Sequence, residues 1–131
     1  MRKLHEEGKI VYHGLLNDVR ELIKEIHCII HPTFYPEGMS NVLLESAASC
    51  RPIISTDRPG CREAIDDKLN GYLVRERSGD DLTEKVEMFL ALSFEEKKQM
   101  GINGRSKVGK EFDRNIVVQK YIEKIKRITG Q

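Results

Sequence analysis

The sequence predicts an α/β protein with a Rossmann-like parallel sheet that is covered by helices on both faces. Short apolar segments, too short for helices, alternate with longer segments in which apolar residues recur at helical spacing. Alternation of this kind is typical of parallel strands joined by helical crossovers, which cover both faces of the sheet. A length of 131 residues suffices for a single domain with its own core, so we expect one domain over residues 1–131.

Four short strands are expected, each closed by residues that interrupt regular structure. They are Lys9–His13, Cys28–Ile30, Ile53–Thr56 and Gly71–Val74. The segments that follow the first three are His13-Gly14, His31–Gly38 and Thr56–Gly60. Ligands of open parallel sheets bind at the carboxyl ends of the strands. We therefore expect these three segments to converge on a ligand at one edge of the sheet.

Helical periodicity fills the rest of the chain, after a polar start over residues 1–8. In the first half of the chain we expect a helix capped by Asn17, a helix from about Met39 that Arg51-Pro52 ends, and a short helical piece over Cys61–Asp66. An amphipathic helix is expected over Asp80–Leu92, with Leu82, Val86, Phe89 and Leu90 pointing inward. A helix capped by Ser93 and a helix over Asn115–Ile128 follow. Glu96 completes a capping box with Ser93, whereas Gly101, Gly104 and Gly109 leave the end of that helix open.

The last of these helices has a wide apolar face. Its apolar residues are Val117, Val118, Tyr121, Ile122, Ile125 and Ile128, and its charged side carries Lys120, Glu123, Lys124 and Arg127. Basic residues on a helix can meet a membrane or a partner, but a core-packed helix with a solvated side is the favoured interpretation.

The segment from Pro36 to Glu45 combines a polar loop with the start of a helix. Pro36 and Gly38 keep Glu37 in the loop, while Glu45 lies on the helix about a turn and a half in. The helix N-terminus between the two carboxylates offers unpaired N–H groups and a positive dipole end, which suit phosphate. From Ser40 to Glu45 the axial rise is about 7.5 Å, close to the span from a diphosphate to a ribose. The unit could therefore hold a nucleotide sugar, with the ribose on Glu45 and the sugar on Glu37. For an arbitrary pair of glutamates the favoured interpretation is that both are solvated surface residues, because charged side chains are mostly exposed.

The composition argues against several other functions. Charge is balanced, with 22 Lys+Arg and 21 Asp+Glu, and aromatic content is 6% without Trp, so neither a nucleic-acid footprint nor a base-stacking platform is indicated. Three cysteines without metal spacing favour a reducing cytoplasm. No apolar run approaches the roughly 20 residues of a membrane span, and no secretory signal is recognised. A metal site at His27, Cys28 and His31 is disfavoured because side chains alternate along a strand.

The pattern EGMSNVLLESAASCRPIIST, in which seven residues separate Glu37 from Glu45, resembles the signature of GT-B, family 4 type retaining glycosyltransferases (glycosyl transferases group 1). The likeness covers roughly residues 9–127. It includes Val11–Gly14, His31–Thr33, Asp57–Glu63, Asn70–Val74 and Gly79-Asp80. It implies the second, sugar-nucleotide-binding domain of a GT-B fold, truncated at its N-terminal side. Cell-surface polysaccharide or glycoconjugate synthesis is the implied setting.

The resemblance assigns roles to individual residues. Glu37 would be the catalytic residue that holds a hydroxyl of the donor sugar, and Glu45 would bind the ribose. The remaining implied donor-binding residues are Gly14, Leu15, Gly38, Met39, Ser40 and Asn41. For Glu63 a structural role is favoured over ligand contact. Transfer would proceed with retention and need neither metal nor cofactor, because fixed amides and a helix dipole stabilise the leaving diphosphate.

Three departures from the family pattern qualify these roles. Arg51 stands where the family has Gly, and Pro59-Gly60 stand where it has paired glycines, so altered turns are expected. The family's diphosphate-clamping Arg and Lys lie further upstream of Glu37 than this chain extends. The acceptor-binding first domain is also missing, so on its own the chain should bind donor weakly and transfer nothing. Any contact with the inner face of a membrane would come through a full-length enzyme.

The rival hypothesis is a non-catalytic sugar-nucleotide-binding or assembly module of the same fold, since fold alone does not fix function. Intact Glu37 and Glu45 favour the enzyme. A third possibility, an epimerase or phosphorylase of related architecture, has less support from the loop sequence.

Overall fold

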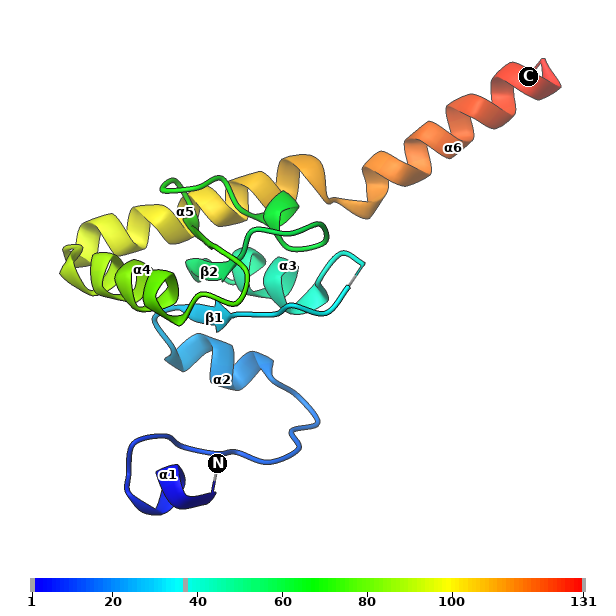
Figure 1. Cartoon of the computed structure of the whole chain (residues 1–131). Helices are drawn as coiled ribbons and strands as arrows, with labels where there is room; N and C mark the ends of the chain where they lie inside the picture. Colours follow the sequence, from blue (N-terminus) through cyan, green and yellow to red (C-terminus); the bar gives the residue numbers. More distant parts are fainter. Residues whose placement is uncertain (1, 37, 131) are drawn as a thin grey trace.

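The computed structural model describes residues 2–36 and 38–130 and contains a three-stranded parallel sheet in the order β1-β2-β3. The strands are β1 (Ile29–His31), β2 (Ile53–Thr56) and β3 (Gly71–Val74). Residue Ile53 of β2 pairs with Ile29 of β1 and with Gly71 of β3. The predicted parallel α/β sheet is confirmed, and three of the four expected strands form (Figure 1).

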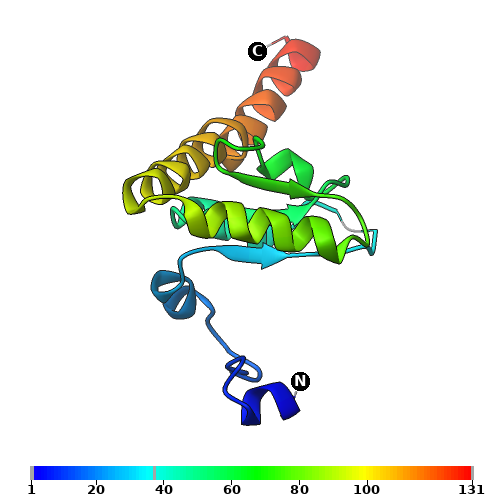
Figure 2. The same cartoon turned by 60° about the vertical axis from the view of Figure 1, so that its left-hand side comes forward.

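Helices cover both faces of this sheet, as the alternation of short apolar segments predicts. The helices are α1 (Arg2–Glu6), α2 (Arg20–Glu25), α3 (Asn41–Ala48), η1 (Arg62–Ala64), α4 (Gly79–Ala91), α5 (Phe94–Glu111) and α6 (Arg114–Thr129). Because side chains alternate along a strand, Ile53 packs with Leu43 and Ala47 of α3, whereas Ile54 packs with Phe89 of α4. Figure 2 shows α4 lying along one face of the sheet.

Local sequence signals correctly predict where α5 begins. Ser93 and Glu96 form the predicted capping box. The sequence left the end of this helix undetermined, because its glycines could have ended it. In the structure, Gly101 and Gly104 lie inside α5 and allow it to approach α3 closely. A Cβ atom at Gly101 would lie 2.1 Å from the Cys50 carbonyl oxygen. These glycines therefore serve close packing rather than helix termination.

The predicted strand over Lys9–His13 is wrong. This segment folds back onto α1 instead, where the Leu4 carbonyl accepts the N–H groups of Lys9 and Ile10, at 2.9 and 3.3 Å. The Tyr12 N–H donates to Nδ1 of His5 at 3.3 Å. A strand forms only where a neighbouring strand takes up its backbone groups, and here α1 takes them up. The apolar side chains of the segment are consequently exposed, with Val11 at 71% and Tyr12 at 59%.

Asn17 does not cap a helix. The first helix after it, α2, begins at Arg20, and the backbone N–H of Arg20 donates to Oδ1 of Asp18 at 2.9 Å. The Asp18 carboxylate therefore accepts an N–H group at the start of this helix, as the sequence had predicted for the Asn17 side chain.

Two expected burials are also wrong. Leu90 of α4 is 65% exposed, because the residue that turns inward at this end of the helix is Phe89. The apolar face of α6 does not pack on the core: residues 117–130 are all exposed, and α6 extends away from the sheet (Figure 1). Within the described residues, no helix is long and apolar enough to cross a membrane.

Candidate functional site

The loops that follow the three strands leave from the same edge of the sheet, because the strands are parallel. They comprise residues 32–36 and 38–40 after β1, residues 57–61 after β2 and residues 75–78 after β3. The expected convergence of His31–Gly38 and Thr56–Gly60 is thus confirmed for the residues that the structure describes. His13-Gly14 follows no strand, so that part of the prediction is wrong.

The N-terminus of α3 lies among these loops, and no side chain of the described residues caps it. Its N-cap residue, Ser40, has extended backbone and its side chain makes no capping hydrogen bond. The first N–H that the helix itself satisfies is that of Leu44, which donates to the Ser40 carbonyl at 3.2 Å. The N–H groups of the first turn therefore have no acceptor within the helix. The first turn carries no acidic side chain, so its positive dipole end is available to an anion.

Glu45 lies further along α3 and is exposed to solvent. With Asn17, Asp18, Val19 and Arg20 it lines a hollow of about 430 Å³. The Arg20 guanidinium donates to both carboxylate oxygens of Asp18, and these hydrogen bonds lower the pKa of Asp18 to about 2. The same hydrogen bonds, with a smaller contribution from the charge of Glu45, raise the pKa of Arg20. The sequence did not indicate this ion pair, which lines the hollow together with Glu45.

The loop after β2 is held by Glu63 and fastened to α3. Gly60, at φ 90°, donates its N–H to Oε2 of Glu63 at 2.8 Å, so the Glu63 carboxylate shapes the loop. The Gly60 carbonyl accepts the N–H of Ser40 at 3.0 Å. The Ser40 N-cap thus sits at a position that the β2 loop fixes.

The departure at Arg51 has a visible consequence at the other end of α3. The left-handed turn residue is Cys50, at φ 57°, and Arg51 follows it in a Schellman-type ending in which Arg51 N–H donates to the Ser46 carbonyl at 2.9 Å. The Arg51 guanidinium then binds the carbonyls of Ile23 and Lys24, at 2.8 and 2.7 Å. Arg51 therefore ties the end of α2 to the end of α3.

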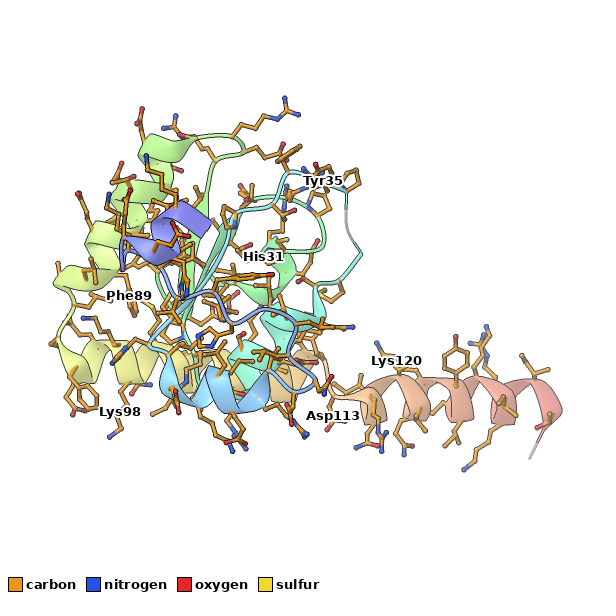
Figure 3. The ribbon with its side chains drawn as sticks, turned by 90° about the horizontal axis from the view of Figure 1, so that it is seen from below. His31, Tyr35, Phe89, Lys98, Asp113 and Lys120 are labelled. Atoms are coloured by element: carbon orange, nitrogen blue, oxygen red, sulfur yellow. The ribbon has the colours of Figure 1, made fainter. Side chains whose placement is uncertain are left out.

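A further cluster at the same edge went unnoticed in the sequence. The Arg58 side chain crosses from the β2 loop to the Phe34 carbonyl and to Glu76 of the β3 loop. The Phe34 ring stacks on Tyr35, with centroids 4.3 Å apart, and the Arg77 guanidinium lies 5.1 Å from its centroid. Figure 3 labels Tyr35 near the margin of the domain and His31 closer to its centre. In the sequence, Arg58 was indicated only as part of the segment Thr56–Gly60, expected at this edge, and of the family-like segment Asp57–Glu63.

The remaining predicted site residues occupy varied positions. Glu37 lies outside the described residues. Gly38, Met39 and Asn41 are exposed beside Ser40 at the start of α3. Gly14 has a left-handed backbone at φ 68°, and Leu15 is 96% exposed, both in the segment that precedes α2. The roles predicted for these residues remain predictions.

The metal-binding alternative finds no support among the described residues, where no group of three His, Cys, Asp or Glu side chains is placed to hold a metal ion.

Burial raises the pKa of Cys28 to about 12, which keeps this thiol protonated near neutral pH.

Comparison with known proteins supports one family. The family model described as "Glycosyl transferases group 1" matches residues 1–91. The chain is 28% identical over 122 residues to the N,N'-diacetylbacillosaminyl-diphospho-undecaprenol alpha-1,3-N-acetylgalactosaminyltransferase of Campylobacter jejuni, which covers 92% of this chain and 31% of that protein.

Solved structures agree on the fold. A glycosyltransferase from Rickettsia africae aligns with a TM-score of 0.84 at 25% identity, covering 98% of this chain and 34% of that one. HepE from Anabaena, solved with UDP, aligns with a TM-score of 0.84 at 17% identity, covering 96% of this chain and 34% of that one. The chain thus spans about a third of the length of the relatives it matches.

Proposed function

The chain belongs to the group 1 glycosyl transferases, and from this premise we propose that it holds the donor, a nucleoside diphosphate sugar, for glycosyl transfer by a GT-B enzyme. The observation that carries the proposal is the open N-terminus of α3, with an exposed carboxylate further along the same helix. The diphosphate would bind the free N–H groups of the first turn, and the ribose would reach Glu45. A rise of about 7.5 Å from Ser40 to Glu45 matches this separation.

The likeness to HepE supports the choice of ligand. HepE was solved with UDP and with UDP-glucose, and it shares the fold of this chain. In this chain the hollow beside Glu45 has room for a nucleoside, and the Arg20–Asp18 pair forms part of its lining. We therefore propose that the nucleoside lies over this hollow, close to Gly14 and Leu15, and that the sugar extends from the diphosphate towards Gly38 and Met39.

The proposed chemistry follows from what the α3 N-terminus offers. As the bond between sugar and diphosphate breaks, negative charge grows on the diphosphate. N–H groups that are already aimed at this position stabilise the transition state more than the ground state, without reorganisation. This supports transfer that needs no metal. Glu37 is proposed to orient the donor sugar for transfer with retention, as in family 4 type enzymes.

A second domain is proposed to bind the acceptor and to pack against α6. The support is the apolar face of α6, which is exposed although amphipathic helices normally bury such a face. Its members are Val117, Val118, Tyr121, Ile122, Ile125 and Ile128. The name of the Campylobacter relative includes a lipid diphosphate acceptor, which supports a role in cell-surface polysaccharide or glycoconjugate synthesis at the inner side of the membrane.

A charge introduced at the helix N-terminus tests the diphosphate position. Asn41→Asp adds a carboxylate to the first turn of α3, where it favours the helix by about 0.3–1 kcal/mol but repels an anion. We expect unchanged or higher stability to urea and at least about tenfold weaker UDP binding, or 1.4 kcal/mol, in an NMR titration. Asn115→Asp, which adds the same charge to the first turn of α6, is the matched control. Equal UDP affinity in Asn41→Asp and wild type would contradict the proposed site.

A further inference from the structure

The turn after β2 gives Arg58 a fixed starting point. The Arg58 N–H donates to the Thr56 carbonyl at 2.9 Å, and the Arg58 carbonyl accepts the N–H groups of Cys61 and Arg62 at 3.1 and 3.0 Å. The backbone on both sides of Arg58 is therefore hydrogen-bonded within the turn. Its side chain leaves the turn in a defined direction.

The Arg58 side chain joins the loops that follow all three strands. It is 14% exposed, and its Nη1 donates to the Phe34 carbonyl and lies 3.4 Å from Oε1 of Glu76. The Nε group of Arg58 is buried and has no hydrogen-bond partner in the described structure. Burying an unpaired N–H opposes folding. The Nη1 nitrogen thus makes the hydrogen bond to Phe34 and also the closest approach to Glu76.

The connection from β1 to α3 is held at two described points by the β2 loop. One point is the Phe34 carbonyl, which Arg58 binds. The other is the Ser40 N–H, which donates to the Gly60 carbonyl at 3.0 Å. Arg77 adds a cation–π contact to the Phe34 ring at 5.1 Å. The backbone before and after the middle of this connection is therefore fixed relative to β2.

We propose that Arg58 is a positioning residue for donor binding: it holds the β1–α3 connection so that the first turn of α3 is already arranged for the diphosphate. This inference rests on the proposed function. Ordering a loop at the moment of binding weakens binding, so a connection that is fixed beforehand binds its ligand more tightly. Because the Glu76 side chain is 47% exposed, its ion pair with Arg58 contributes little to the stability of the fold.

Two substitutions separate positioning from bulk. Arg58→Met keeps a long, unbranched side chain but removes both polar contacts. Arg58→Lys keeps a positively charged donor on a side chain that is one bond shorter, so a small shift of the loop lets one ammonium serve both Phe34 and Glu76. The lysine also lacks the unpaired Nε–H. Positioning therefore predicts that lysine rescues what methionine loses.

Amide hydrogen exchange in the ligand-free chain measures whether Arg58 fixes the connection. In Arg58→Met, we expect at least tenfold faster exchange at Thr33 and Ser40 and unchanged exchange at Ile54 in the core. In Arg58→Lys, all three amides should stay within threefold of wild type. Wild-type exchange at Thr33 and Ser40 in Arg58→Met would overturn the inference. So would equal acceleration at Ile54, which would show a general loss of stability.

UDP binding, followed by NMR titration, measures whether the fixed connection serves the donor. We expect Arg58→Met to weaken UDP binding at least fivefold and Arg58→Lys to stay within twofold of wild type. If Arg58→Met binds UDP as tightly as wild type does, the positioning role of Arg58 is wrong, whereas the proposed function still stands. Absence of UDP binding to the wild-type chain would overturn the proposed function, and the donor-positioning role with it.

Discussion

Replacing Glu45 by alanine isolates one side of the proposed donor site. Glu45 is exposed on α3, and its carboxylate accepts no hydrogen bond within the described structure. Alanine is the most favourable helix residue, and substitutions at such surface positions change the free energy of unfolding by less than about 0.5 kcal/mol. Any loss of nucleotide binding in Glu45→Ala therefore reports on the ligand rather than on the fold.

The magnitude follows from the bonds that would be lost. A ribose that donates its hydroxyl groups to the Glu45 carboxylate makes hydrogen bonds to a charged group, which contribute about 1.5–3 kcal/mol. We therefore expect Glu45→Ala to weaken UDP binding by about tenfold to hundredfold. Titration calorimetry, or NMR titration if binding is weak, measures this change. Glu87→Ala, which removes an exposed carboxylate from α4, is the matched control.

A modified ligand makes the Glu45 test specific. The 2′,3′-dideoxy analogue of UDP keeps base and diphosphate but lacks the ribose hydroxyls. It should bind wild type and Glu45→Ala with equal affinity, because the bonds that the substitution removes are absent from the ligand. If Glu45→Ala folds normally and binds UDP as wild type does, the ribose assignment is wrong. If it loses affinity equally for both ligands, Glu45 acts elsewhere on the nucleotide.

Three further predictions concern chemistry, packing and reactivity. In the complete enzyme, Glu37→Gln should keep nucleoside diphosphate affinity within about threefold while lowering kcat and kcat/KM for transfer at least about tenfold; near-normal turnover would exclude Glu37 from the mechanism. Gly101→Ala should lower the free energy of unfolding in urea by about 1–3 kcal/mol, because its Cβ would lie 2.1 Å from the Cys50 carbonyl oxygen, whereas Gly109→Ala, with open space around it, should not destabilise. At pH 8.5, Cys28 should alkylate far more slowly than Cys50, because partial burial raises the pKa of Cys28 to about 12 and leaves little thiolate; equal rates would contradict this raised pKa.

Features that depend on nearby residues could be predicted from the sequence. The helix α3 and the strand β2 follow each other within residues 41–56, and their apolar spacing, the Arg51-Pro52 stop and the short strand after it are local signals. The capping box at Ser93 is likewise defined by four consecutive residues. The common edge at which the loops after the strands converge followed from these elements, because parallel strands place their carboxyl ends together.

Features that depend on distant partners could not be predicted. The segment Lys9–His13 has the pattern of a strand, but α1 takes up its backbone groups, and no local signal shows which partner wins. Arg58 has the composition of a solvated loop residue, yet it is 14% exposed because two other loops surround it. The apolar face of α6 predicts burial without showing against what, and the structure leaves this face exposed.

The central claim is that the open N-terminus of α3 binds the diphosphate of a sugar nucleotide, and an NMR titration of the isotope-labelled chain with UDP-glucose tests it most directly. The account predicts that the largest amide shift changes fall on Asn41, Val42 and Leu43, with smaller changes at Glu45. Contradiction would come from shifts centred on the hollow at the opposite edge of the sheet, lined by Lys68, Tyr72, Glu96 and Asn103 among others. The claim would equally be contradicted if saturating UDP-glucose left the amide shifts of the first turn of α3 unchanged.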